Sequence, residues 1–344
     1  MSKCCNACFN DNVIVRHIEN RGTKTESACV FCESTNTHRI ETSNLSNLFE
    51  PFMQLFQAEE TGDKISKLID VKWSVFAEKV SNRKNELLLD IANGFRSEPA
   101  RNIVNEPSRF RSDLVLDQSS ELWRQFSGSI ESINRFFYPE ELDLGSRLVP
   151  SLQLIEKEIK KESIYFRARI CTSEERAFPA NKMGAPPNHK STAGRANPAG
   201  IAYLYLADKI NTAVHEVRPS TLDLVSIAKF KTVSDLRVID LRKISPFQFS
   251  KAEDFEKQVS EIPLLNSIGE HLAKPIHSST ANVKYAPTQY LSELLKFNGW
   301  DGVLYKSALN QEGYNLALFN PESAECIKVL ELHSVSKVNV IYTP

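Results

Sequence analysis

The sequence predicts an α+β protein in which a helical run precedes a run where strands and helices mix. Three observations support this: two Cys-x-x-Cys pairs near the N-terminus, apolar residues at helical spacing over about 41–150, and strand-like apolar runs from about 151 onward. We therefore expect three parts, namely a metal-binding ribbon over 1–40, a helical domain over 41–150 and a mixed domain over 151–344.

The cysteine pairs have the spacing of a zinc ribbon, with twenty residues between the two pairs. The expected ligands are Cys5, Cys8, Cys29 and Cys32. Four thiolates make a closed tetrahedral site that stabilises a fold and does no chemistry, so we predict structural zinc. Cys4 leaves the register open because Cys4-x-x-x-Cys8 is also possible, and His17 and His38 are further candidate ligands. The alternative, a set of unrelated reduced thiols, does not explain two pairs.

The composition of the chain bears on whether it binds nucleic acid, associates with a membrane or is secreted. The chain has 344 residues, of which 41% are hydrophobic and 25% charged, and its formal net charge is -1. This charge gives no global electrostatic argument for binding nucleic acid or a membrane surface. We find no apolar run long enough to span a bilayer, and the first residues lack the apolar core of a signal peptide. We expect a cytoplasmic protein.

The helical domain shows no group of residues typical of a catalytic site. Apolar residues between Leu45 and Phe56 follow the spacing of an amphipathic helix, which Pro51 is expected to kink or restart. Trp73 to Ala92 gives another helical pattern, and Gly94 ends it. We interpret the charged residues here as solvated helix faces.

A compact loop, strand and helix over Gly194 to Pro219 gathers the residues of greatest interest. A Gly- and Pro-containing loop precedes a predicted strand over Ile201–Ala207, and a short helix over Thr212–Val217 follows. Arg195, Tyr205 and Glu216 lie on this unit. Each of them alone is more often structural. Together they have the chemistry to hold a phosphate, a flat ring and a developing positive charge.

Two further segments add candidates to this unit. Ile164–Ile170 is a predicted strand that carries Arg167. Pro287–Phe297 reads as a helix with proline in its first turn, and Asp301–Ser307 is a short strand that ends at Ser307.

The order of these residues resembles the RES domain family, which is named for its arginine, glutamate and serine. The resemblance covers roughly Ser151 to Leu332. It rests on Phe166-Arg167, Gly194-Arg195-x-Asn197-x-x-Gly200, Tyr205, Ala213-x-x-Glu216, Thr288-Gln289 and Asp301-Gly302-x-x-Tyr305-x-Ser307. The ribbon and the helical part are similar to the N-terminal extension of some longer RES proteins.

The resemblance implies a fold, a substrate and a partner. RES domains are α+β modules related in fold to ADP-ribosyltransferase toxins, and characterised members release nicotinamide from NAD by hydrolysis or phosphorolysis. Many are toxins with an antitoxin, so an antitoxin or regulatory protein is an expected class of partner beside NAD. The implied NAD-binding residues are Arg167, Arg195, Tyr205, Glu216 and Ser307. This chain departs from the family at Ala196, where many members carry an aromatic residue, and it is much longer than a minimal toxin.

The chemistry of NAD cleavage assigns roles to the same residues, with Glu216, Ser307 and Arg167 as the catalytic candidates. Breaking the nicotinamide–ribose bond forms a cation-like transition state, which the Glu216 carboxylate can stabilise. Arginine forks suit a pyrophosphate. Tyr205 can stack on the nicotinamide riboside. A serine without a base is a weak nucleophile, so a hydrogen-bonding role suits Ser307 better.

Two other functions are also compatible with the sequence. The first is an ADP-ribosyltransferase that acts on a macromolecule. The second is a module that binds NAD or a protein partner without turnover. No G-x-G-x-x-G motif precedes a helix, so the sequence does not support a Rossmann dehydrogenase.

Overall fold

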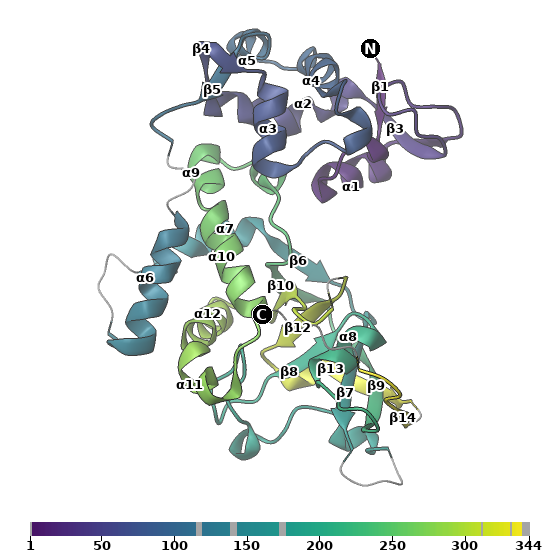
Figure 1. The fold of residues 1–344 in the computed structure, drawn as a ribbon, viewed down its shortest axis with the longest axis vertical. Helices are drawn as coiled ribbons and strands as arrows, with labels where there is room; N and C mark the ends of the chain where they lie inside the picture. Colours follow the sequence, from purple (N-terminus) through teal and green to yellow (C-terminus); the bar gives the residue numbers. More distant parts are fainter. Residues whose placement is uncertain are drawn as a thin grey trace. The chain divides into compact units, whose positions relative to one another are not determined.

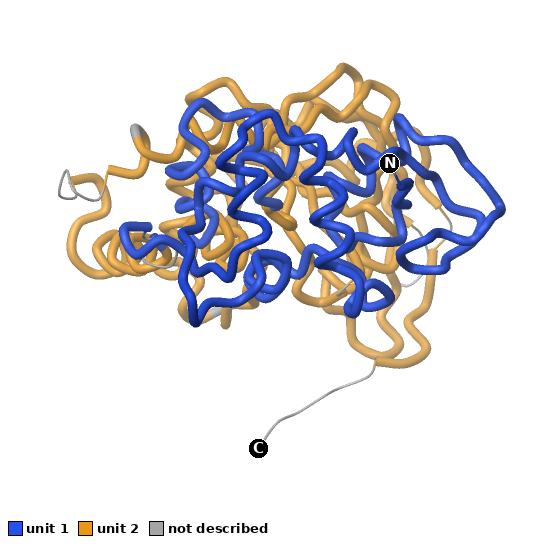
Figure 2. The backbone as a smooth tube through the Cα atoms, turned by 90° about the horizontal axis from the view of Figure 1, so that it is seen from above, with its two compact units in different colours: residues 1–119, 245–263 blue, residues 120–244, 264–344 orange. Residues whose placement is uncertain are grey.

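The computed structural model describes residues 2–114, 119–137, 143–171, 177–310, 312–330 and 332–338 (Figure 1). The chain forms two compact units, drawn in different colours in Figure 2. Unit 1 contains Met1–Ser119 and Ser245–Pro263, and unit 2 contains Ser120–Ile244 and Leu264–Pro344. The structure combines helices with a large sheet, which confirms the α+β prediction.

The boundary between the units differs from the divisions expected from the sequence at residues 40 and 150. Helix α7 (Leu144–Leu154) and nearly all of α6 (Ser119–Ser132) belong to unit 2. Residues 245–263 return to unit 1. An apolar periodicity marks a helix, but it does not say which core the apolar face joins. The division into three independently folding domains therefore stays a prediction.

Unit 1 begins with a three-stranded antiparallel sheet of order β1-β3-β2. Its strands are β1 (Lys3–Cys5), β2 (Thr23–Thr25) and β3 (Thr37–Glu41). Between β1 and β2 lies α1 (Asn12–Arg21), which begins after Asp11. The Asp11 carboxylate accepts hydrogen bonds from the backbone N–H groups of Val13 and Ile14 and so caps the helix.

The rest of unit 1 consists mainly of short helices around aromatic side chains. They are α2 (Ser46–Phe49), α3 (Ile65–Trp73), α4 (Lys84–Ala92), α5 (Glu98–Ile103) and α9 (Phe255–Ser260). The ring of Phe52 lies 4.5 Å from that of Phe247 and 5.0 Å from that of Phe255, between centroids. These contacts attach the returning segment to the core of unit 1.

Two local features of unit 1 concern the sequence patterns directly. A 3₁₀ helix over Glu50–Leu55 with Pro51 in its first turn follows α2, so the expected restart at Pro51 is confirmed. A two-stranded sheet of β4 (Phe56–Asp63) and β5 (Ser108–Phe110) also forms, which the helical patterns did not predict. The rings of Phe56 and Phe110 pack across it with centroids 4.8 Å apart.

Unit 2 is built on a nine-stranded sheet in which the strand order is β13-β9-β7-β8-β12-β11-β10-β6, with β14 paired to β9. Its strands are β6 (Glu156–Ile159), β7 (Ile164–Ile170), β8 (Leu204–Ala207), β9 (Leu224–Thr232), β10 (Leu236–Asp240), β11 (Gly302–Lys306), β12 (Tyr314–Leu318), β13 (Ala324–Val329) and β14 (His333–Ser334). The described pairs are antiparallel apart from β10 with β11.

The core of unit 2 lies on both sides of this sheet. One cluster contains Leu204, Leu206 and Leu316, and the other contains Ala168, Ala207 and Ala213. Ala213 belongs to α8 (Ile210–Glu216), which packs against β7 and β8 (Figure 1). The remaining helices of unit 2 are α10 (Ile262–Ala273), α11 (Ala281–Lys284) and α12 (Ala286–Phe297).

Strands β7 and β8 are joined at a single residue pair, Phe166 with Ala207. By contrast, β7 pairs with β9 along its whole length, from Ile164 to Ile170. The residues on both sides of the single pair line the cavity described below.

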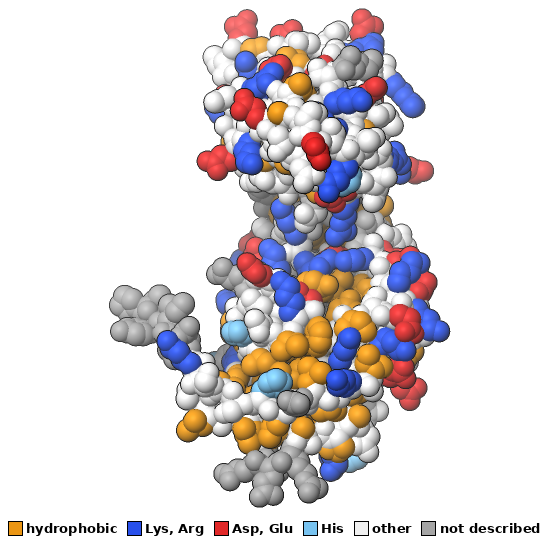
Figure 3. Space-filling view, turned by 90° about the vertical axis from the view of Figure 1, so that its right-hand side faces the viewer, with side chains coloured by type: hydrophobic (Ala, Val, Ile, Leu, Met, Phe, Trp, Pro, Cys, Tyr) orange, Lys and Arg blue, Asp and Glu red, His pale blue; other side chains and the backbone are white. Residues whose placement is uncertain are grey.

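The surface carries charges of both signs. Figure 3 shows acidic and basic side chains on one face of the molecule. Within the described residues, the helices are all too short or too polar to cross a bilayer. The cytoplasmic location stays a prediction.

Candidate functional site

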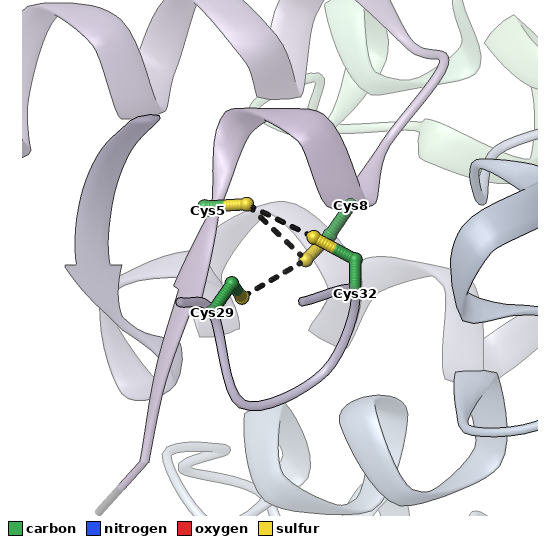
Figure 4. Close-up of side chains that lie close together, drawn as sticks. All are labelled: Cys5, Cys8, Cys29 and Cys32. Carbon is green, nitrogen blue, oxygen red and sulfur yellow. Dashed lines mark hydrogen bonds between the residues drawn. The ribbon is translucent and has the colours of Figure 1, made fainter. Parts of the chain in front are cut away.

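The four predicted cysteines lie together in unit 1 and are buried (Figure 4). The Sγ atom of Cys5 lies 3.7 Å from that of Cys8 and 3.3 Å from that of Cys32, and the Sγ atoms of Cys8 and Cys29 are 3.6 Å apart. Tetrahedral zinc with bonds to sulfur of about 2.3 Å places its thiolates roughly 3.8 Å apart. The donor set and its dimensions therefore fit one zinc ion.

The structure also separates Cys5 from Cys4. Successive side chains of a strand point to opposite faces, and only Cys5 of this pair joins the cluster. Burial raises the pKa of the Cys4 thiol, which favours its protonated form. Neither His17 nor His38 belongs to the cluster.

A basic side chain from the helical part covers the second cysteine knuckle. Arg83 donates a hydrogen bond to the carbonyl oxygen of Val30, and its guanidinium lies 5.4 Å from the centroid of the Phe31 ring. A divalent metal ion together with four thiolate ligands would form a site of net negative charge. The arginine therefore suits a position in the outer shell of a metal site.

Unit 2 contains a cavity of about 300 Å³ beside the junction of β7 and β8. Four predicted residues, Arg167, Arg195, Tyr205 and Glu216, line it, whereas Ser307 does not. The other lining residues are Phe166, Ala168, Ala193, Gly194, Leu206, Ala207, Ala213, Val217, Tyr285, Tyr305 and Asn315.

Glu216 ends α8 and is fixed at one carboxylate oxygen. Its Oε1 accepts a hydrogen bond of 2.7 Å from the Ser307 hydroxyl and one of 2.8 Å from the Asn315 amide. Within the described part of the chain, Oε2 makes no hydrogen bond. One oxygen therefore holds the carboxylate in place and the other remains available to a ligand.

Ser307 directly follows β11 and holds the Glu216 carboxylate through its hydroxyl group. Its Oγ accepts hydrogen bonds from the backbone N–H groups of Leu309 and Asn310, at 3.2 and 3.1 Å. These contacts leave its single proton for the bond to Glu216. This geometry suits a positioning residue rather than a nucleophile.

Arg167 places a buried cation at the cavity. Its Nη1 donates to the carbonyl oxygen of Tyr205 at 3.2 Å, whereas its buried Nε has no hydrogen-bond partner. Burial lowers the pKa of this guanidinium to about 10, so it stays charged at neutral pH. A buried charge with an unused donor beside a cavity is suited to binding an anion.

Arg195 lines the cavity and also caps a helix. Its Nη1 donates to the carbonyl oxygens of Leu272, Ala273 and Lys274, at 2.9, 2.8 and 2.7 Å. These carbonyls lie at the C-terminal end of α10, where a positive charge is favourable. Within the described residues, its Nε and Nη2 make no hydrogen bonds and remain available to a ligand.

The Tyr205 hydroxyl is occupied by the neighbouring loop. It donates to the side-chain oxygen of Asn197 at 2.7 Å and accepts from the backbone N–H of Ala196 at 3.0 Å. Burial raises the pKa of this phenol, so it stays neutral. The ring is therefore the part of Tyr205 that can contact a ligand.

The loop that carries Arg195 is held in a close-packed arrangement. A Cβ on Gly194 would lie 2.5 Å from the Asn197 side-chain oxygen and 2.8 Å from the Tyr205 hydroxyl, so a larger residue would displace this hydrogen-bonded pair. From α12, the Gln289 amide donates to the carbonyl oxygens of Gly194 and Asn197, and the Thr288 hydroxyl donates to that of Arg195. Thr288 and Gln289 therefore fix the position of the arginine.

Sequence reasoning missed two side chains that the structure brings to the cavity, Asn315 and Tyr285. Asn315 is 4% exposed and lies opposite Tyr305 and Ala207 in the sheet. A polar residue inside the apolar run of β12 was the available signal. Tyr285 immediately precedes α12, and nothing in the local sequence marked it.

A comparison with models of known protein families found a match. The family model described as "RES domain" matches residues 166–337, which is half of the chain. The chain belongs to the RES domain family. The matched region contains every residue that lines the cavity, and the cysteine cluster lies outside it.

A solved structure also resembles part of the chain. It is the crystal structure of the M. tuberculosis MbcT-MbcA toxin-antitoxin complex, with 14% sequence identity and a TM-score of 0.32. The match covers 55% of the present chain and 92% of the other. At this similarity nothing about the function of the present chain follows. No curated protein matches the chain.

Proposed function

We propose that this RES domain protein cleaves the nicotinamide–ribose bond of NAD. The observation that carries the proposal is the Glu216 carboxylate, which lines the cavity with one oxygen fixed by two donors and the other available to a ligand. A carboxylate held in this way is preorganised for positive charge that develops on a ribose.

The reaction assigns Glu216 to the transition state. As the bond from ribose to nicotinamide breaks, positive charge spreads over the ribose ring. A fixed carboxylate interacts with that charge more strongly than with the ground state, so it raises the rate more than the affinity. Ser307 and Asn315 contribute by holding Glu216 in position.

The two arginines and the tyrosine bind the substrate in this proposal. Arg167 offers an unused buried Nε, and Arg195 offers Nε and Nη2. Guanidinium groups match the oxygens of a pyrophosphate. The Tyr205 ring, with its hydroxyl tied to the loop, provides a rigid surface for the nicotinamide riboside.

Asn315→Asp is expected to shift the pH profile of the reaction. The new carboxylate would lie within about 3 Å of Glu216, and two such groups cannot both ionise easily. The pKa of the pair rises, so activity should be lost at low and neutral pH and recover as the pH increases. We expect the acid limb of kcat to move upward by about one to three pH units. Initial rates of NAD cleavage between pH 5 and 9 measure this shift.

The matched control for this variant is Asn315→Ser, which keeps a small donor and adds no charge. Its acid limb should stay where the wild-type limb lies, even if kcat falls. An Asn315→Asp protein that is folded and has the wild-type pH profile would remove Asn315 from the support of Glu216.

The products of NAD labelled in the adenine ring distinguish hydrolysis, phosphorolysis and transfer. Hydrolysis yields labelled ADP-ribose without phosphate in the buffer, whereas phosphorolysis requires phosphate and yields a phosphorylated ADP-ribose. Label on protein or nucleic acid indicates a transferase. Binding without any labelled product indicates a module that does not turn NAD over, which contradicts the proposal.

We also propose that the cysteine cluster binds one structural zinc ion and that the protein works in the cytoplasm. Reduced cysteines in two Cys-x-x-Cys pairs are typical of metal sites in reducing compartments. The zinc would stabilise the ribbon and take no part in the reaction. An antitoxin or regulatory protein that controls the RES domain remains part of the proposal.

A further inference from the structure

A second cavity adjoins the first in unit 2. It measures about 620 Å³, and four residues, Ala193, Arg195, Glu216 and Tyr285, line both cavities. We name the first the inner chamber and the second the outer chamber. The shared residues form the boundary between them, so a ligand that reaches past Arg195 and Glu216 enters both chambers.

The inner chamber is too small for a whole dinucleotide. Its volume of about 300 Å³ lies at the lower end of the range for ligand pockets, which reach roughly 1,000 Å³. Its walls include Phe166, Val217 and Tyr305, which suit a flat ring. The nicotinamide half of NAD fits this chamber, and the other half must lie elsewhere.

The outer chamber carries groups that suit an anion joined to an aromatic base. Arg218 and His277 line it in addition to the shared Arg195, and Glu216 is the acidic residue of its described lining. The Tyr285 ring at the boundary offers a surface for stacking.

The backbone at Arg218 has an unusual conformation. Its φ is 49°, in the left-handed region that arginine rarely adopts, and its N–H bonds to the carbonyl oxygen of His215 at the end of α8. Such strained backbone conformations are found preferentially at active and ligand-binding sites. Arg218 follows Glu216 by two residues, and the tight turn between them leaves both residues in the lining of the outer chamber.

We infer that the outer chamber binds the adenosine diphosphate half of NAD, with Arg218 and His277 as additional ligand-binding residues and Tyr285 at the boundary. This inference rests on the proposed function. The ribose that reacts then lies at the boundary beside Glu216, the pyrophosphate continues past Arg195, and the adenosine occupies the outer chamber.

Arg218→Gln and His277→Gln test the inference. The first removes the guanidinium and the second removes the imidazole, and each keeps an extended, uncharged polar side chain. We expect each to raise KM for NAD and Kd for ADP-ribose about tenfold, the effect of one charge-assisted hydrogen bond. Inhibition by free nicotinamide should keep its wild-type constant, and kcat should change by less than about threefold. Calorimetry with ADP-ribose and steady-state kinetics with NAD provide these values.

The matched control is Arg124→Gln. Arg124 lies on α6, is exposed and pairs with Glu121, and it lines neither chamber. Its KM and its Kd for ADP-ribose should equal those of the wild type. Circular dichroism of all three variants checks that they are folded.

The outcomes separate this inference from the proposed function. If the wild type cleaves NAD but both chamber variants keep wild-type KM and Kd, the outer chamber does not bind the ADP half and the inference fails alone. Inorganic phosphate serves as a second probe. If the variants lose phosphate binding but keep the wild-type Kd for ADP-ribose, the chamber binds the phosphate that attacks in phosphorolysis, and the inference is wrong. A wild type that binds ADP-ribose through Arg218 without cleaving NAD contradicts the proposed function and supports the inference.

Discussion

Glu216→Gln should lower the rate of nicotinamide release by about a hundred- to a thousand-fold and leave the affinity for NAD within a few-fold of wild type. The glutamine oxygen can still accept the hydrogen bonds from Ser307 and Asn315, so the side chain keeps its place. Its NH₂ group then faces the cavity in place of a charged oxygen. The variant therefore loses the stabilisation of the ribosyl cation and remains folded.

Single-turnover measurements with saturating NAD isolate the chemical step, and calorimetry gives the affinity. The control is Glu312→Gln, because Glu312 is exposed in the turn between β11 and β12 and lines neither chamber. It should match the wild type in both measurements. A folded Glu216→Gln protein that releases nicotinamide at nearly the wild-type rate would make Glu216 a structural residue.

Cys29→Ser should abolish tight binding of the one zinc ion that we expect per chain. Removing one thiolate opens a closed four-ligand site, and zinc contributes about 10–16 kcal/mol in small zinc domains. The ribbon should then become sensitive to proteases. Elemental analysis of protein purified without chelators, together with limited proteolysis, measures both effects.

Cys4→Ala is a demanding control for this prediction, since Cys4 is fully buried next to a proposed ligand. It should keep one zinc ion per chain even if the ribbon loses some stability from the cavity. Wild-type protein without any bound metal would show that the cluster is a set of reduced thiols. Loss of zinc in Cys4→Ala together with its retention in Cys5→Ser would show that Cys4 replaces Cys5 as a ligand.

The sequence was most informative where short-range patterns determine the structure. The helix expected over Pro287–Phe297 is α12 (Ala286–Phe297), and the strand expected over Asp301–Ser307 is β11 (Gly302–Lys306). Proline in the first turn and the glycine that precedes the strand are local signals. The cysteine spacing also identified its cluster, because ligands in two knuckles need only a local turn each.

The strand expected over Ile201–Ala207 is shorter, since β8 begins at Leu204. The side chain of Asn197 donates to the carbonyl oxygen of Ile201, and that of Asn188 accepts from the N–H of Ala202. These loop contacts replace the sheet bonds of the first residues. A period of two in the sequence cannot reveal such competition from loop side chains.

The support of the site depended on contacts between distant parts of the chain. Asn315 lies 99 residues from Glu216, and their contact depends on the register between β8 and β12. Arg195 caps a helix end 77 to 79 residues away. Such pairs follow from the assembled fold of unit 2, and no local pattern encodes them.

Nicotinamide release from NAD by the purified 344-residue chain tests the account most directly. The wild-type protein and Glu216→Gln are incubated side by side with NAD, with and without phosphate, and nicotinamide is quantified by chromatography. The account predicts steady release by the wild type in at least one of the two buffers and a rate lower by about a hundred-fold or more in the variant. Absence of release by a folded, zinc-containing wild type in both buffers, or equal release by the two proteins, would contradict it.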